Sequence, residues 1–309
     1  MTESAFIECL RRLASHPAAR GLLDDAAVLE VGGTTLVLTH DMLVEGVHFL
    51  PDDPPQDVAW KLVAVNLSDL AAKGARPLGA LLGFPLGDEA WDRSFVEGLA
   101  GALAAFHLPL LGGDTVTGPR VLGLTAIGEA SGPVPSRTGA RPGDRLWVSG
   151  AIGDAGAGLR VLKGELGPAP ALVERYRTPR ARLALGQALA PLVSAMMDVS
   201  DGLLIDAKRM AAASAAAVEI ALEAIPLSDA YLAAVGDGRA ARIDAATAGD
   251  DYELLFAARP DRTRDVLALG ERLAIPLTPI GLFADGAGLV LTDDGEPLPL
   301  PPRLGWEHG

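Results

Sequence analysis

Residues 62–74 read Leu-Val-Ala-Val-Asn-Leu-Ser-Asp-Leu-Ala-Ala-Lys-Gly, and no other stretch of the chain says as much about its fold. The apolar residues of this stretch recur with the period of a helix. Gly74 is a typical residue just beyond a helix end, and Pro77 follows it where a helix does not continue. We therefore predict a helix over Val58–Lys73.

Polar residues interrupt the apolar run, and three of them are regularly spaced. Asn66, Asp69 and Lys73 follow one another at helical spacing, so they share one face of the predicted helix. One interpretation is a solvated stripe in which Asp69 pairs with Lys73. The other is a buried carboxylate, which needs a cation or a metal ion beside it because burying an unpaired charge is costly. The narrow stripe and its apolar flanks favour the second interpretation.

Strand and helix patterns alternate on both sides of this helix. They predict strands over Thr35–Thr39, Leu78–Phe84 and Val121–Ile127, and a second helix over Trp91–Ala105. The segment Gly132–Asp144 is rich in Gly, Pro, Ser and Arg, a composition that marks a domain boundary.

A second alternating region follows this boundary. Its predicted strands are Leu146–Ser149, Ala195–Asp198, Val218–Leu222, Glu253–Ala257 and Leu289–Leu291. Its predicted helices follow the glycine-rich turn Gly150–Gly158 and cover Arg180–Leu192 and Ser200–Ala213, with Ser200 as N-cap, while Pro297–Pro302 is expected to be extended. We therefore predict an α/β protein of the α+β type with two mixed α/β subdomains, residues 1–138 and residues 139–309.

The composition indicates a globular chain. Of its 309 residues, 49% are hydrophobic, which suffices for a sizeable core and excludes intrinsic disorder. Cys9 is the single cysteine, so intramolecular disulfides and thiolate zinc sites are excluded. The net charge of −14 repels nucleic acid and anionic lipid, so no nucleic-acid partner is expected.

The sequence does not predict a membrane protein. The uncharged run Gly98–Gly113 is shorter than the roughly 20 apolar residues that a membrane helix needs, and it contains Pro109. The first residues include Glu3 and Glu8 and lack an uninterrupted apolar run, so no signal peptide is expected. We expect a cytoplasmic protein without a membrane partner.

Several aspartates stand where solubility alone does not explain them. Asp41 and Asp114 each follow an apolar, strand-like run, and ligands of open α/β sheets gather at the carboxyl ends of strands. An ordinary turn aspartate is the alternative for either residue alone. Asp198 and Asp201 lie at a turn from a strand to a helix, whose free N–H groups favour anions. Together these carboxylates predict a magnesium site, which phosphate usually completes.

Other candidate residues carry weaker signals. Gly112–Thr115 and Gly150–Gly156 could bring backbone amides to a phosphate, but neither matches a P-loop or a Rossmann fingerprint, and a tight turn is the simpler interpretation. Arg137 is either a phosphate clamp or a surface arginine. His48 has no partner at zinc-ligand spacing, and the absence of a Gly-x-Ser-x-Gly elbow gives triad hydrolysis no support.

Taken in order, these segments resemble the thiamine-monophosphate kinases, members of a superfamily of ATP-binding enzymes that includes aminoimidazole ribonucleotide synthetase. The resemblance covers nearly the whole chain, and its specific motifs are the helix around Asn66–Asp69 and the string Gly249–Leu254. The other matching stretches are Asp24–Ala27, Thr39–Asp41, Gly46–Phe49, Gly112–Thr115, Ser136–Gly139 and Asp198–Leu203. At His40 the chain departs from the family pattern, which more often has threonine there.

The resemblance implies a role for each matched residue. It implies magnesium ligation by Asp25, Thr39, Asp41, Asp69, Asp114, Asp198 and Asp201, among which Asp41, Asp69 and Asp114 are catalytic. It implies nucleotide contacts from Gly113, Asp114, Arg137 and Ser200, and substrate contacts from His48, Asp250 and Trp306. It also implies an aminoimidazole ribonucleotide synthetase-like fold and a homodimer formed through the N-terminal sheets.

The implied reaction transfers the γ-phosphoryl group of ATP to thiamine monophosphate with the help of several Mg²⁺ ions. Both reactants and the protein are anionic, so cations are needed to bring them together. The acceptor phosphate is already ionised near neutral pH, so no general base is required. The alternatives are another ATP-dependent enzyme of the superfamily (aminoimidazole ribonucleotide or selenophosphate synthetase-like), a metal-dependent phosphohydrolase, and a non-catalytic nucleotide-binding regulator.

Overall fold

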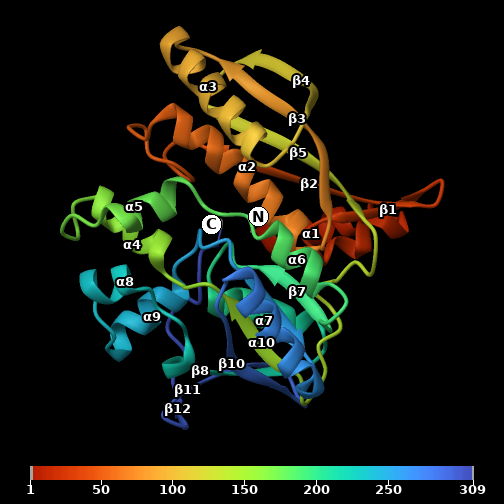
Figure 1. The fold of residues 1–309 in the computed structure, drawn as a ribbon, viewed down its shortest axis with the longest axis vertical. Coiled ribbons are helices and arrows are strands. Elements are labelled where there is room, and N and C mark those ends of the chain that lie inside the picture. Colours follow the sequence, from red (N-terminus) through yellow and green to blue (C-terminus); the bar gives the residue numbers. More distant parts are fainter. Residues whose placement is uncertain (1–2, 308–309) are drawn as a thin grey trace.

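Two β-sheets with flanking helices make up the chain, as the computed structural model in Figure 1 shows. The structure describes residues 3–307. The N-terminal half contains α1 (Glu3–Arg11), the 3-10 helix η1 (Pro17–Leu22), β1 (Ala27–Val31), β2 (Thr34–Val44), α2 (Pro55–Ala72), β3 (Arg76–Leu86), α3 (Glu89–Ala105), β4 (Leu110–Thr117) and β5 (Val121–Ala130).

The C-terminal half begins after the linker that follows β5. It contains β6 (Arg145–Ser149), α4 (Asp154–Leu162), α5 (Pro170–Arg177), α6 (Leu183–Leu189), β7 (Ala195–Asp198), α7 (Leu203–Ala213), β8 (Ala217–Ala221), η2 (Leu222–Ala224), α8 (Asp229–Ala234), α9 (Arg239–Thr247), β9 (Leu254–Ala258), η3 (Pro260–Arg262), α10 (Thr263–Leu273), β10 (Leu277–Ala284), β11 (Gly288–Asp293) and β12 (Glu296–Leu298). Two sheets with helices confirm the predicted mixed α/β class, while the division at residues 138/139 stays a prediction.

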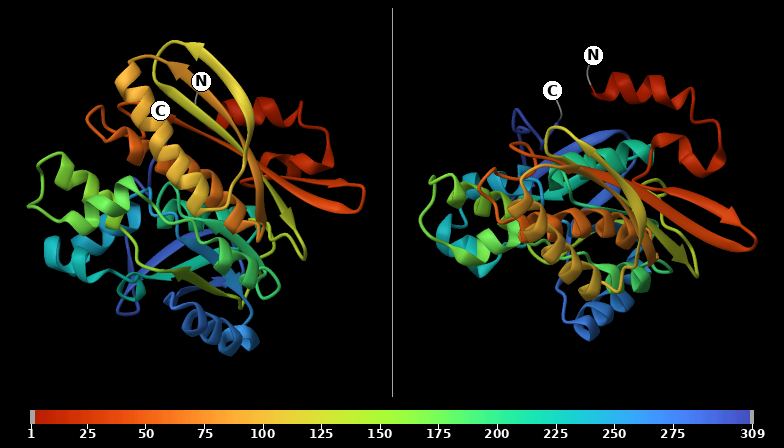
Figure 2. Two further views of the ribbon diagram at one scale, coloured as in Figure 1. Left: turned by 45° about the horizontal axis from the view of Figure 1, so that its top comes forward. Right: turned by 90° about the horizontal axis from the view of Figure 1, so that it is seen from above.

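The N-terminal sheet has the strand order β1-β2-β5-β3-β4. Helices α2 and α3 cover one of its faces (Figure 1), and apolar side chains such as Val37, Leu62 and Phe95 fill the layer between them. The β1–β2 hairpin extends beyond the body of the molecule (Figure 2). Apolar side chains of β2, β3 and β4 stay exposed, among them Met42, Leu81, Leu86, Leu110, Leu111 and Val116.

The C-terminal sheet has the strand order β12-β11-β8-β10-β6-β9-β7, and its strands β6 and β9 are covered on both faces. Alternate residues of β6 show this. Leu146 and Val148 belong to the core that includes α7, whereas Trp147 belongs to the core that includes α6 and α10. Strands covered on both faces are apolar throughout, which explains why the sequence pattern predicts β6, β7 and β9 as continuous apolar runs.

Strand β10 lies at the centre of this sheet, yet the sequence pattern does not predict it. Pro279 and Gly281 interrupt its apolar residues, and the register with β6 shifts between these two positions. A proline cannot donate a ladder hydrogen bond, so it is tolerated here at the irregularity. Helices α5, α8, α9 and α10 are likewise absent from the sequence prediction.

Several predicted boundaries are wrong, and three of them concern helices of the C-terminal half. Helix α7 begins at Leu203 with Gly202 as N-cap and without a side-chain cap, so Ser200 is not the N-cap. Helix α4 already begins at Asp154, inside the predicted glycine-rich turn. Helix α6 covers only Leu183–Leu189 of the predicted range Arg180–Leu192. One short irregular segment separates it from α5, and another separates it from β7.

Helix α2 connects the two halves. Leu62 near its middle packs in the N-terminal core, whereas Ala71 at its end packs in a C-terminal core with Trp147. The predicted end of the helix is confirmed, since Gly74 has a φ of +63°, which favours glycine. Within residues 3–307, no helix is both long and apolar enough to cross a membrane.

Candidate active site

The polar face of α2 is buried where the two halves meet. The Lys73 Nζ atom lies 2.5 Å from Asp24 Oδ1 and 2.8 Å from Asp25 Oδ2, and its side chain is fully buried. Asp69 instead accepts a hydrogen bond from the Thr39 hydroxyl group, and no ion pair of Asp69 is found in residues 3–307. The interpretation as a solvated Asp69–Lys73 pair is therefore wrong, because Asp69 is a buried carboxylate without a cation.

Carboxylates from three parts of the chain meet beside α2. One oxygen atom each of Asp25, Asp69 and Asp198 lies within 4.8 Å of the other two. Ser68 Oγ, next to Asp69 on the helix, donates to Asp198 Oδ2 at 2.5 Å. Carboxylate oxygens at this spacing can share divalent cations such as Mg²⁺.

Asp41 is adjacent to these carboxylates, although not at the end of a strand as predicted. It lies inside β2, which continues through Met42-Leu43 to Val44. Its backbone N–H donates to Asn66 Oδ1 at 2.9 Å, so a second polar residue of α2 holds it. Burial and the nearby charge of Asp25 raise the pKa of Asp41 to about 6.

The acidic cluster, here Asp25, Asp41, Asp69 and Asp198, is not fully charged near neutral pH in the absence of a cation. Burial and the charge of Asp25 raise the pKa of Asp198 to about 8, and burial together with neighbouring aspartates raises the pKa of Asp69 well above its ordinary value. Burial would raise the pKa of Asp25 too, but Lys73 and another cation, Arg137, outweigh it and lower that pKa. A metal ion that binds to such carboxylates displaces their protons, so the raised pKa values fit a metal site.

Arg137 faces the acidic cluster from the linker between the halves. Its guanidinium group forms an ion pair with Asp25, and its backbone N–H donates to Asp24 Oδ1 at 3.2 Å. Asp24 is also paired with Arg20 at 2.6 Å. Arg137 is therefore a partly buried cation that lies against the cluster, and its role as a phosphate clamp stays a prediction.

The turn after β7 continues the acidic surface. Asp201 forms an ion pair with Arg209, and its backbone N–H donates to Asp206 Oδ2 at 3.1 Å. Burial and the charge of Asp201 raise the pKa of Asp206 to about 7. Asp206 on α7 thereby fixes the turn that carries Ser200 and Asp201, and the sequence offered no signal for it beyond an acidic residue in the first helical turn.

His48, Asp250 and Trp306 line one cleft of about 400 Å³. The rest of its lining comes from Val47, Ala155, Gly156, Leu159, Tyr176, Asp201, Thr247, Ala248, Gly249, Tyr252, Arg303 and Gly305. Trp306 is tied to the turn after β7, because its backbone N–H donates to the Asp201 carbonyl oxygen at 2.8 Å. The structure therefore brings the three predicted substrate residues together, with Asp201 in the same wall.

Two buried charges near this cleft were not predicted. Lys61 on α2 contacts Asp250, and Glu253 is held by Ser149, Arg175 and Arg182. Lys61 does carry a signal, since it is a lone charge in an apolar stretch of the predicted helix, as Asp69 is. Glu253 was assigned only to a strand, because a single carboxylate before an apolar strand gives no sign of its partners.

Asp114, Gly113 and His40 lie apart from the acidic cluster. Asp114 is exposed on edge strand β4, opposite Gly83 of β3, and the sequence prediction of a turn at Gly112-Gly113 is wrong. This register requires glycine at position 113, because a Cβ atom there would lie only 1.9 Å from a carbonyl oxygen of β3. His40 Nδ1 lies 2.9 Å from Thr125 Oγ1. The predicted ligand and nucleotide roles of Asp114 and Gly113 stay predictions.

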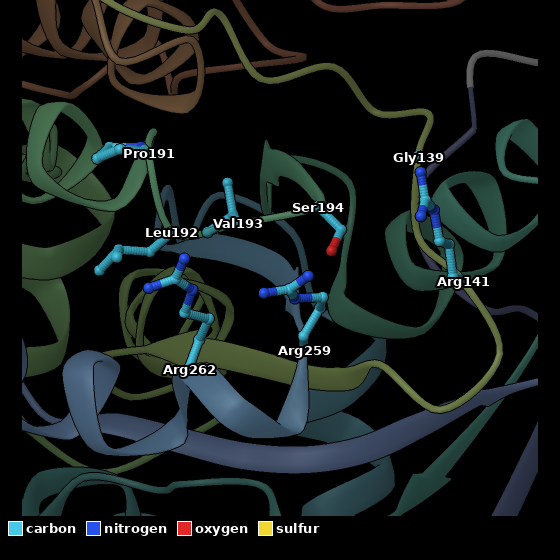
Figure 3. Close-up of a pocket in the computed structure, with 8 residues that line it drawn as sticks. All are labelled: Gly139, Arg141, Pro191, Leu192, Val193, Ser194, Arg259 and Arg262. Atoms are coloured by element: carbon cyan, nitrogen blue, oxygen red, sulfur yellow. The ribbon is translucent and has the colours of Figure 1, made fainter.

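A second hollow lies in the C-terminal half and is lined by Arg141, Arg259 and Arg262 (Figure 3). Its volume is about 380 Å³. Among residues 3–307, its lining includes no carboxylate and none of the predicted site residues. The acidic cluster and the adjoining cleft are therefore the candidate active site.

Comparison with known proteins agrees with this fold. Residues 23–130 match the family model described as AIR synthase related protein, N-terminal domain, and residues 141–294 match AIR synthase related protein, C-terminal domain. These two domains define the class of the fold. The chain belongs, within that class, to the thiamine-monophosphate kinase family, which confirms the resemblance seen in its motifs.

The relatives cover most of the chain. The thiamine-monophosphate kinase of Caulobacter vibrioides is 43% identical over 95% of this chain and 86% of its own length, and that of Escherichia coli K12 is 42% identical over 93% and 91%. The crystal structure of the Stenotrophomonas maltophilia K279a enzyme is 39% identical, covers 95% of this chain and 96% of its own, and has a TM-score of 0.80. AaThiL complexed with AMPPCP and TMP is 30% identical over 100% and 97%, with a TM-score of 0.87.

Proposed function

We propose that this chain transfers the γ-phosphoryl group of ATP to thiamine monophosphate, giving thiamine diphosphate and ADP. The observation that carries the proposal is the meeting of the acidic cluster with a cleft of about 400 Å³ that contains His48, Asp250 and Trp306. Asp201 lines the cleft, and its charge also acts on Asp41 of the cluster. Family membership supports the same reaction, and a family member is described in complex with AMPPCP, an ATP analogue, and TMP.

Magnesium is proposed as the cofactor, and the residues fit it. Asp41, Asp69 and Asp198 are carboxylates with raised pKa values and no ion pair in residues 3–307, so a divalent cation would relieve their repulsion. The proposed ligands are Asp25, Thr39, Asp41, Asp69, Asp198 and Asp201 at the junction of the two halves, together with Asp114 of the exposed edge strand β4. Bound Mg²⁺ would neutralise the phosphate charges of both substrates.

For the nucleotide we propose contacts from Gly113, Asp114, Arg137 and Ser200. Arg137 supports this best, because its planar guanidinium group already faces the cluster and can bind phosphate oxygens in pairs. When the nucleotide binds, Arg137 would share its donors between Asp25 and a phosphate group. Asp25 would keep Lys73 as its second cation, so the carboxylate would stay charged.

The acceptor would lie in the cleft with its phosphate toward Asp201. An oxygen atom of that phosphate attacks the γ-phosphorus atom, and the bond to the bridging oxygen of ADP breaks. No protein base is needed, because the attacking oxygen is already ionised. The role of the chain is to bind, align and neutralise the two anions, which is where catalytic power in phosphoryl transfer arises.

A homodimer in the cytoplasm completes the proposal. Support for the dimer comes from the exposed apolar side chains of β2, β3 and β4 in the N-terminal sheet, including Met42, Leu81 and Val116. The use of ATP as donor supports the cytoplasm as the compartment. The division into domains of residues 1–138 and 139–309 is proposed from the composition of the linker.

One assay tests the proposed function. Incubation of the protein with ATP, Mg²⁺ and thiamine monophosphate should yield thiamine diphosphate and ADP in equal amounts. A metal-dependent phosphohydrolase would release inorganic phosphate without ATP, and a synthetase of the same superfamily would leave thiamine monophosphate unchanged. Either result would refute the proposal.

A further inference from the structure

Lys61 of α2 is a buried cation behind the cleft that contains His48 and Asp250. Its side chain is 2% exposed, and Nζ lies 2.8 Å from Asp250 Oδ2. The same nitrogen donates to the backbone carbonyl oxygen of His48 at 2.9 Å and lies 4.0 Å from the ring centroid of Tyr176. Lys61 therefore contacts three residues that line the cleft without lining it itself.

The loop that carries Asp250 has a strained backbone. Asp250 has a φ of +70° and Tyr252 a φ of +49°, values that side-chain-bearing residues rarely adopt. Such strain persists only where the surroundings fix the conformation, and it is concentrated at functional sites. Here the N–H groups of Asp250 and Tyr252 donate to the carbonyl oxygens of Ser200 and Val199, each at 2.8 Å. Lys61 adds a contact from the other half of the chain.

The ion pair also determines what Asp250 offers to a ligand. The Asp250 side chain is 28% exposed while Lys61 is buried, so only the carboxylate of the pair faces the cleft. Lys61 binds Oδ2, and the Tyr252 hydroxyl group donates to Oδ1 at 3.0 Å. Each carboxylate oxygen keeps a second lone pair. Asp250 is thus a fixed hydrogen-bond acceptor with a compensated charge, and not a free counter-ion.

We propose that Lys61 is the positioning residue of the acceptor site: it orients Asp250 to accept a hydrogen bond from the amino group of an aminopyrimidine. This inference rests on the proposed function, since thiamine monophosphate carries an aminopyrimidine beside its thiazolium ring. An ionised carboxylate only accepts hydrogen bonds, so it selects for an N–H donor at that position. The cationic thiazolium ring would then be bound by other groups of the cleft.

The test compares steady-state kinetics of Lys61→Met, Lys61→Arg, Asp250→Asn and the double variant Lys61→Met/Asp250→Asn. Lys61→Met should raise the KM for thiamine monophosphate roughly 10- to 100-fold, because small misplacements of a contact cost that much, and should change the KM for ATP less than twofold. Lys61→Arg, which keeps the charge, should recover part of the loss. Lys163→Met, at an exposed lysine, is the matched control.

The double variant keeps the inference testable if Lys61→Met alone folds poorly, because it leaves neither charge of the ion pair without its partner. If Lys61 acts through Asp250, the double variant should have the same KM for thiamine monophosphate as Asp250→Asn. Multiplied effects of the two substitutions, or an equal rise of both KM values, would overturn the inference. Failure of the wild-type protein to form thiamine diphosphate would instead refute the proposed function.

An acceptor analogue tests the direction of the hydrogen bond. A thiamine monophosphate analogue with a carbonyl group in place of the amino group should be a poor substrate for the wild-type protein. Asp250→Asn introduces an N–H donor, so its preference between the two acceptors should shift toward the analogue by about tenfold in kcat/KM. An unchanged preference would overturn the assignment of Asp250 as acceptor.

Discussion

At the scale of single residues, Asp25 and Asp69 show how neighbouring aspartates acquire different properties. Asp25 is paired with Lys73 and Arg137, and these cations lower its pKa although burial opposes them. Asp69 accepts a hydrogen bond from Thr39 and has no cationic partner within residues 3–307, so burial and nearby aspartates raise its pKa. The two carboxylates thus differ because cations lie beside Asp25, whereas a hydroxyl group and other aspartates lie beside Asp69.

Asp198→Asn tests the acidic cluster as a metal site. We expect the turnover number to fall at least 100-fold, the order of loss seen when an electrostatic contribution to the transition state is removed. The metal-free protein should melt a few degrees higher, because a buried carboxylate with a raised pKa is removed. Turnover and calorimetry are compared with Asp237→Asn, an exposed control. Turnover close to wild type at limiting Mg²⁺ would contradict the assignment.

Arg137→Lys tests the proposed nucleotide clamp. Lysine keeps the charge near Asp25 but lacks the planar fork that binds two oxygens, so we expect the KM for ATP to rise roughly tenfold. The KM for thiamine monophosphate should rise less. Arg264→Lys, at an exposed position on α10, is the control and should change neither constant. A larger rise for thiamine monophosphate would move Arg137 to the acceptor side.

At the scale of elements, the close packing of α3 on α2 depends on one glycine. A Cβ atom on Gly98 would lie 2.3 Å from the Cα atom of Gln56, a distance that the two backbones cannot accommodate without moving apart. On the same helix, Gly101 has no atom within 4 Å of an added Cβ. The two glycines are thus a matched pair that separates packing from helix propensity.

We expect Gly98→Ala to destabilise the protein by about 1–3 kcal/mol, because overpacking forces the helices apart. Gly101→Ala should stabilise it by about 0.5–1 kcal/mol, since alanine loses less conformational freedom in a helix than glycine does. Urea unfolding of both variants, followed by circular dichroism, measures the difference. Effects of the same sign would show that the α2–α3 contact is looser than the structure indicates.

At the scale of the whole molecule, the candidate site exists only because the two halves are joined. Asp25, Asp41 and Asp69 come from the N-terminal half, whereas Asp198 comes from the end of β7 in the other half. Lys61 and Lys73 of α2 also reach across the junction, Lys61 to Asp250 and Lys73 to the carbonyl oxygen of Met196. Metal binding at this site should therefore stabilise the assembly of the two halves.

The stabilisation by Mg²⁺ should depend on pH. Asp41 and Asp198 have pKa values raised to about 6 and about 8, so their contribution to the stability of the metal-free protein is lost as the pH rises through these values. The lowered pKa of Asp25 changes the stability only at pH values below the pKa that Asp25 has in the unfolded chain, so it does not cancel this loss. Bound Mg²⁺ would replace the protons.

We expect Mg²⁺ to raise the melting temperature by several degrees more at about pH 8.5 than at about pH 5.5, because fewer protons compete for the carboxylates. Differential scanning fluorimetry with and without Mg²⁺ across this range measures the effect. K⁺ at equal ionic strength controls for screening. A shift that is the same at both pH values would show that these aspartates do not bind the ion.

The local pattern predicted most of the strands, and two of its errors have physical reasons. Helix α2, β7 and β5 could be located because their apolar periodicity and their end signals agree. Strand β10 was hidden, since its Pro279 and Gly281 are acceptable only at a break in register that its neighbours create. The N-cap of α7 was misplaced because Asp206 binds the turn from within the helix, which the residue sequence before the helix does not reveal.

The sequence by itself determined the α/β class, the family and the residue types of the site, because apolar periodicity and short motifs are local properties. The tertiary structure decided which of those residues meet: Asp25, Asp69 and Asp198 share one centre, while Asp114 lies on the exposed edge strand β4. It also decided that Lys73 pairs with Asp25 and not with Asp69, and that Lys61 supports Asp250. Charges interact through space over a few ångströms, and only the fold sets those distances.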